Sequence, residues 1–215
     1  MQYGPIAPYQ SVFITARPGM GATTLATCIA NAFLDTGARC LIFANAYRLS
    51  AHYAERIRLI REGGRLEDMF RMENTYGKLT VVDNNYLESY SVLRKVEEAS
   101  PDVVIFEEPY FLAMKERDLV LLSECLRSQG ICFVFVTHIK RRRCLWFGEE
   151  QNTPRASLHR RLARHMDAVC IPYREEYYRE ERGRCEEIRI YERGARSYRC
   201  VRVEFDFSKQ RVVKK

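Results

Sequence analysis

The sequence predicts a three-layer α/β fold, in which helices cover both faces of a mostly parallel β-sheet. Short segments that are apolar throughout recur along the chain, and such runs are typical of strands buried on both faces of a parallel sheet. Stretches with the apolar spacing of amphipathic helices lie between them, and this alternation favours the three-layer arrangement. The chain has 215 residues, 47% hydrophobic and 29% charged, which is the size and composition of a soluble globular domain.

The expected elements can be placed in chain order. Strands are predicted at residues 11–15, 40–43, 79–82, 102–106, 131–136 and 168–171, and helices at 23–34, 51–61, 87–99 and 115–128. Two later β-like runs, 187–191 and 200–205, flank Gly194 and predict a closing antiparallel hairpin. Residues 140–155 are the most loop-like segment. Because no repeat or linker divides the chain, we expect one domain over 1–215, with a basic tail at 206–215.

Charge and cysteine content narrow the class of protein. The net charge is +7, and residues 140–215 hold 21 Lys and Arg against 12 Asp and Glu. This basic C-terminal third indicates an anionic partner, nucleic acid first, although a solvated surface is the alternative. The eight scattered cysteines lack C-x-x-C spacing and are predicted to be reduced thiols. Neither a membrane span nor a secretory signal is expected, so the predicted location is cytoplasmic.

A Gly-rich turn follows the first predicted strand and precedes the first predicted helix, which is the setting of a phosphate-binding loop. In such a loop the backbone N–H groups face a phosphate and a Thr hydroxyl holds Mg²⁺. The candidate phosphate-binding residues are Arg17, Pro18, Gly19, Met20, Gly21, Ala22, Thr23 and Thr24. Ala16 replaces the first Gly of the motif, and Ala22 replaces its Lys. The alternative interpretation is an ordinary tight turn between a strand and a helix.

The segment Ala-Arg-Pro-Gly-Met-Gly followed by two Thr resembles the Walker A motif of DnaB-type replicative helicases, in their C-terminal motor domain. Further segments resemble that domain in the same order: residues 41–47, 103–107, 134–141, 167–178, 187–190 and 201–205. The resemblance covers nearly the whole chain and implies a RecA-like P-loop fold with a C-terminal antiparallel hairpin. It also implies ATP and Mg²⁺ as cofactors, and a ring helicase, another replication protein or further copies of the chain as partners. We expect neither the family's N-terminal domain nor its linker helix before residue 11.

The departures from the family fall on its catalytic positions. Carried over by position, the replacements are Ala22 for the P-loop Lys, Ala46 for the Glu that polarises water, Glu107 for the Walker B Asp and His138 for the sensor Gln. An Ala cannot act as a general base, and phosphoryl transfer depends on positioned charges. The resemblance therefore implies an abandoned active site, in which Thr23 and Glu107 are the remaining candidate ligands for Mg²⁺.

Two basic regions are candidates for further contacts. The family's Lys and Arg that reach a neighbour's γ-phosphate fall at Glu192 and Gly194, and Arg193 or Arg196 could replace them. The candidate residues for binding single-stranded nucleic acid are Lys140, Arg141, Arg142 and Arg143, followed by the aromatic Trp146 and Phe147. Positive charge beside aromatic rings suits single strands, although a solvated loop or a protein-docking surface is equally consistent.

Three functions remain open. The first is a helicase-like pseudo-ATPase that acts as a binding or regulatory module in DNA replication or related DNA metabolism. The second is a working ATPase with substitute residues, in which Arg17 or a partner's residue replaces the Lys, and Glu107 or Glu108 is the base. The third is a single-stranded nucleic-acid-binding scaffold that takes no nucleotide.

Overall fold

The computed structural model describes residues 9–44, 78–83, 87–108, 114–138, 160–174, 186–195, 197–206 and 211–214. The strands in these ranges are β1 Ser11–Ala16, β2 Cys40–Ala44, β3 Leu79–Asp83, β4 Val103–Glu107, β5 Cys132–His138, β6 Ala168–Arg174, β7 Glu186–Glu192, β8 Arg199–Asp206 and β9 Arg211–Lys214. The helices are α1 Ala22–Asp35, α3 Ser89–Ala99, α4 Glu116–Ser128 and α6 Arg160–His165. Each strand predicted from an apolar run is present, usually one to three residues longer than the run itself.

The strands form a single sheet in the order β3-β2-β4-β5-β1-β6-β7-β8-β9. The pairs from β3 to β6 are parallel, whereas β7, β8 and β9 continue the sheet with antiparallel pairs. Every residue of β1, β2 and β4 is buried, as expected for strands covered on both faces. Because β1 lies between β5 and β6, the turn that follows it opens near the middle of the sheet, where open α/β sheets bind ligands.

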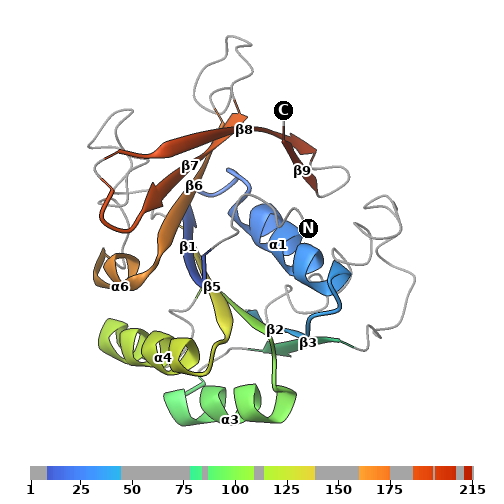
Figure 1. The fold of residues 1–215 in the computed structure, drawn as a ribbon, viewed down its shortest axis with the longest axis vertical. Helices are drawn as coiled ribbons and strands as arrows, with labels where there is room; N and C mark the ends of the chain where they lie inside the picture. The colour runs from blue at the N-terminus through green and yellow to red at the C-terminus, as the bar shows by residue number, and fades with distance from the viewer. Residues whose placement is uncertain are drawn as a thin grey trace.

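Helices cover both faces of the sheet (Figure 1). On one face α1 packs through Leu25 and Ile29 into a core cluster that contains Val12 and Ile14 of β1. On the opposite face, α3, α4 and α6 share a cluster with five phenylalanines of β1, β2, β4 and β5. In that cluster the Phe106 ring stacks between the rings of Phe43 and Phe135, with both pairs of centroids 4.9 Å apart. The predicted three-layer α/β fold with a C-terminal antiparallel hairpin is therefore confirmed.

The C-terminal strands add a feature that the sequence analysis did not include. Strand β9 forms within the range predicted as a basic tail, and it pairs antiparallel with β8. Val212 of β9 packs against the core cluster on the α1 side, so β8 and β9 pass over α1 (Figure 1). Helix α6 was also not predicted. The predicted helix at 51–61 and the predicted loop at 140–155 lie outside the described residues.

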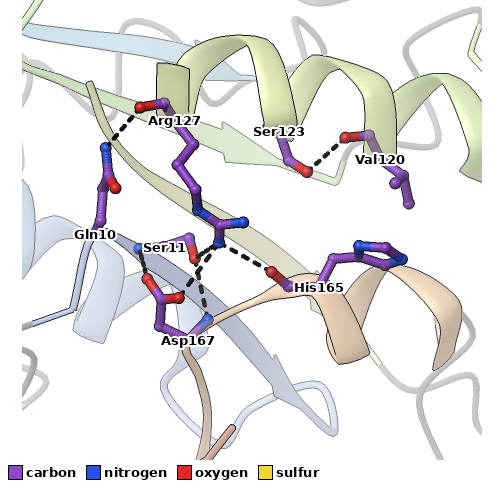
Figure 2. A network of polar contacts seen from close by, with 7 residues as sticks. All are labelled: Gln10, Ser11, Val120, Ser123, Arg127, His165 and Asp167. Atoms are coloured by element: carbon purple, nitrogen blue, oxygen red, sulfur yellow. Dashed lines mark hydrogen bonds and ion pairs between the residues drawn. The ribbon is translucent and has the colours of Figure 1, made fainter. Parts of the chain in front are cut away.

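A polar network joins four elements at the amino edge of the parallel strands (Figure 2). Arg127, in the last turn of α4, donates from Nη2 to the Ser11 Oγ at 2.6 Å, to the His165 carbonyl at 2.9 Å and to the Asp167 Oδ1 at 3.3 Å. The other oxygen of Asp167 accepts the backbone N–H of Ser11 at 2.9 Å. The network fixes the start of β1 to the segment that leads from α6 into β6.

None of the six cysteines among the described residues is in a disulfide. Burial raises the pKa of Cys40 and of Cys170 to about 12, whereas Cys200 is exposed. None of the described helices has both the length and the apolar character needed to cross a bilayer.

Candidate functional site

The turn from β1 into α1 has the backbone of a phosphate-binding loop. Gly19 and Gly21 have φ of 85° and 91°, in the left-handed region where glycine is favoured. Gly21 is the N-cap of α1, and no side chain in the described part of the chain caps the helix there. The first-turn N–H groups of α1 therefore point toward the carboxyl edge of the sheet, where the helix dipole favours an anion.

Thr23 and Glu107, which are 84 positions apart in sequence, meet beside this turn. The Thr23 hydroxyl, in the first turn of α1, donates to the Glu107 Oε1 at 2.5 Å. Glu107 is the last residue of β4 and only 1% exposed, so the rigid sheet holds its carboxylate. A hydroxyl that donates its proton to a carboxylate keeps its lone pairs for a cation. Oxygen ligands are those that Mg²⁺ prefers, and Mg²⁺ usually takes one or two protein groups together with phosphate and water. The pair fits Mg²⁺ in the roles predicted for Thr23 and Glu107.

The position of the P-loop lysine is occupied by a small buried side chain. Ala22 is 1% exposed, and its methyl group belongs to the core cluster on the α1 side. No charge can reach a phosphate from this position. Arg17 lies at the start of the same turn with a half-buried side chain. The described residues of the turn therefore combine two oxygen groups suited to Mg²⁺ with an uncharged side chain at the lysine position.

A second acidic residue is paired at the same edge of the sheet. Glu108, directly after β4, has φ of 48°, and its N–H donates to the Val136 carbonyl at 2.9 Å. Its carboxylate contacts Nδ1 of His138, the last residue of β5. Burial lowers the pKa of His138. The hydrogen bond and charge of Glu108, together with the charge of Glu107, raise the pKa by a larger amount, so the net shift is upward. The upward shift of the pKa favours the protonated form of the His138 ring beside the Glu108 carboxylate.

The sequence matches no protein-family model and no curated protein. One solved ATPase domain superposes with a TM-score of 0.78 at 15% identity, over 95% of this chain and 84% of that one. A DnaB-like replicative helicase, solved in a study of its interactions with primase, superposes with a TM-score of 0.73 at 14% identity. That match covers 94% of this chain and 56% of the helicase chain, so this chain spans only a little more than half the length of the helicase. The chain has the fold of a DnaB-like helicase ATPase domain.

In this helicase-type fold, Arg193 lies far from the turn at 17–24. It occupies the β7–β8 turn, where its N–H donates to the Asp167 carbonyl at 2.8 Å, beside the start of β1. The turn at 17–24 follows the other end of β1, and six residues of strand span about 16 Å. Arg193 therefore does not join the site of its own chain, and the role that the resemblance implies for it is toward a neighbouring subunit. Ala46, Arg196 and the four basic residues at 140–143 lie outside the described residues.

Two contacts of the site could not be read from local sequence. The sequence indicates Glu108 and His138 as separate candidate residues and not as a pair. They meet because Glu108 directly follows β4, His138 ends β5, and these two strands are neighbours in the sheet. Phe205, at the end of β8, contacts Gly21. It is one of the apolar residues of an alternating β-strand pattern, so no local feature distinguishes it from an ordinary core residue.

Proposed function

We propose that this helicase-like P-loop domain binds nucleotide weakly with Mg²⁺, does not turn it over, and acts as a regulatory or interaction module in DNA replication or related DNA metabolism. The observation that carries the proposal is the hydrogen bond between Thr23 and Glu107 at a glycine turn whose lysine position is Ala22. The pair of oxygen groups on Thr23 and Glu107 supports binding of a nucleotide together with Mg²⁺. The missing charge supports weak binding and the absence of turnover.

Elementary energetics separates binding from turnover here. A charge-assisted hydrogen bond contributes about 1.5–3 kcal/mol, so its loss weakens affinity by roughly 10- to 150-fold. The N–H groups at the N-terminus of α1 and a Mg²⁺ ion beside Thr23 leave enough attraction for binding. Turnover also needs a general base for the attacking water and a positive side chain that stabilises the charge developing on the leaving group. The sequence has Ala46 at the family position of the base and Ala22 at that of the positive side chain.

The partner that we infer is a protein of the replication machinery, either a ring helicase or a protein that such helicases meet, and the setting is cytoplasmic. One solved helicase with this fold was studied for its interactions with primase. A domain that retains the fold without the chemistry can occupy the same contacts and respond to nucleotide without driving a cycle. Binding of single-stranded DNA through Lys140 to Arg143 remains a prediction from the sequence.

A second candidate function is slow ATP hydrolysis with Glu108 as the base. The observation that favours it is the left-handed φ of 48° at Glu108, because a non-glycine residue in this region costs on the order of 1 kcal/mol, and such residues cluster at functional sites. Its contact with His138 opposes the role, since a carboxylate paired with a cation is a poorer proton acceptor. Phosphate release that is abolished by Glu108→Gln and retained by Glu98→Gln would support this second function.

The deciding experiment is a titration with a fluorescent ATP analogue, with and without Mg²⁺, in which phosphate release is followed in the same samples. We expect micromolar, Mg²⁺-dependent binding without release. Glu107→Gln should reduce the Mg²⁺ dependence, and Ala22→Lys should tighten binding if the buried methyl group can be replaced. Glu98→Gln is the matched control, because it removes an exposed carboxylate on α3. Absence of binding at millimolar analogue would contradict the proposal.

A further inference from the structure

The last part of β8 packs directly against the phosphate-binding turn. A Cβ placed on Gly21 would lie 2.7 Å from Cε1 and 2.8 Å from Cδ1 of Phe205. No real side chain tolerates such a distance, so the ring occupies the space above the Gly21 Cα. Phe205 is only 6% exposed, so the contact is a packed one. Gly21 is thus required both for its φ of 91° and for the room that it leaves to Phe205.

The backbone of Phe205 is fixed by a charged pair on the neighbouring strands. Its N–H donates to the Glu186 Oε2 at 2.6 Å, and the Glu186 Oε1 accepts from the Arg174 Nε at 2.9 Å. The side chains of Arg174 and Glu186 are 17% and 11% exposed, so the pair is shielded from solvent. Arg174 ends β6 and Glu186 begins β7. On its other side, Phe205 is opposite Val212 of β9, which packs against the α1-side core.

We propose that Phe205 is a positioning residue of the nucleotide site: its ring packs against Gly21, and the Arg174–Glu186 pair holds the backbone of Phe205. This inference rests on the proposed function. A phosphate bound at the N-terminus of α1 is held by N–H groups whose directions follow from the backbone at Gly21. A backbone that is already ordered loses less freedom when the ligand binds. The C-terminal strands thereby set phosphate affinity without touching the ligand.

The inference has an expected magnitude and a matched control. Phe205→Leu removes the ring edge from Gly21 while keeping an apolar side chain, and we expect affinity for the ATP analogue to fall about tenfold. Glu186→Ala should lower affinity in the same direction, because it releases the Phe205 backbone. Val201→Ala is the control: Val201 is 9% exposed, lies on the same face of β8 and is four residues from Phe205. It should lower the melting temperature with no change in affinity.

Hydrogen exchange without nucleotide provides a second measurement. We expect the amides of residues 22–24 to exchange faster in Phe205→Leu than in the wild type, and at the wild-type rate in Val201→Ala. Equal exchange in the two variants, or an affinity loss no greater than that of Val201→Ala, would overturn the inference. If the wild type fails to bind the analogue at millimolar concentration, the proposed function and the nucleotide role of Phe205 fall together. In that case faster exchange in Phe205→Leu would show that the ring still orders the turn.

Discussion

Loss of the Arg127 side chain should destabilise the fold more than loss of any exposed ion pair. Arg127 donates to Ser11, His165 and Asp167, and its side chain and that of Asp167 are 28% and 30% exposed. Each of the two shorter hydrogen bonds contributes about 1–1.5 kcal/mol. The ion pair, at 3.3 Å and partly solvated, adds less than about 1 kcal/mol. We therefore expect Arg127→Ala to lower the free energy of unfolding by about 3 kcal/mol.

The assay is urea unfolding followed by circular dichroism, together with a thermal melt. For a domain of this size, about 3 kcal/mol corresponds to a fall in melting temperature of roughly 6–12 °C. A double-mutant cycle with Asp167→Asn should give a coupling energy of about 1 kcal/mol, since the two side chains share one ion pair. Arg94→Ala is the control, because Arg94 forms an exposed pair with Glu98 within α3, and such a pair contributes about 0.3–0.5 kcal/mol. A loss for Arg127→Ala no larger than that for Arg94→Ala would refute the reasoning.

Three further results are expected. Because the folded pKa of His138 is raised above its unfolded pKa of 6.5, its ion pair stabilises the fold fully below pH 6.5 and less as the pH rises through the folded pKa. His138→Gln should therefore cost more stability at pH 5.5 than at pH 9, and an equal cost at both pH values would contradict this. Iodoacetamide labelling of the folded protein at pH 8 should modify Cys200 and spare Cys40 and Cys170, because those two thiols are buried and have a pKa of about 12. Mass mapping checks this, and modification of all three at similar rates would be the contrary result. Phe106→Ala should cost about 3–5 kcal/mol in urea unfolding because it removes the middle ring of the stack, and a cost under about 1 kcal/mol would show that the cavity collapses.

Most of the fold could be predicted because the strands of its parallel part are buried on both faces. A strand such as β4 is apolar at four of its five positions, and this signal is independent of what the strand pairs with. The order of the strands could not be read in the same way, because continuous apolar runs do not specify their neighbours. Helix α6 has six residues, three of them Arg, and β9 has four residues, two of them basic, so neither has enough apolar periodicity to be recognised.

The candidate site also combines features that local sequence shows with contacts that only the folded chain brings together. The turn at 17–24 was recognisable because glycines and threonines occur together within a few residues. That Thr23 bonds Glu107, or that Glu108 pairs with His138, depends on strands that are distant in sequence and adjacent in the sheet. The Arg127 network and the Phe205 contact depend on such long-range packing alone. Local sequence therefore indicates candidate site residues, whereas the residues that pack against them become apparent only in the folded chain.

The central position of β1 has a consequence for biosynthesis. β1 is the first strand described, yet it pairs only with β5 and β6, whose residues follow more than 100 positions later. A nascent chain therefore carries an unpaired, mostly apolar strand until residues 132–170 have left the ribosome, and Gly21 meets its aromatic neighbour only after residue 205. At ordinary rates of translation, the interval between synthesis of β1 and of its two partner strands is roughly 8–30 s. During that time the segment 11–16 has no partner strand and is open to chaperones and to aggregation.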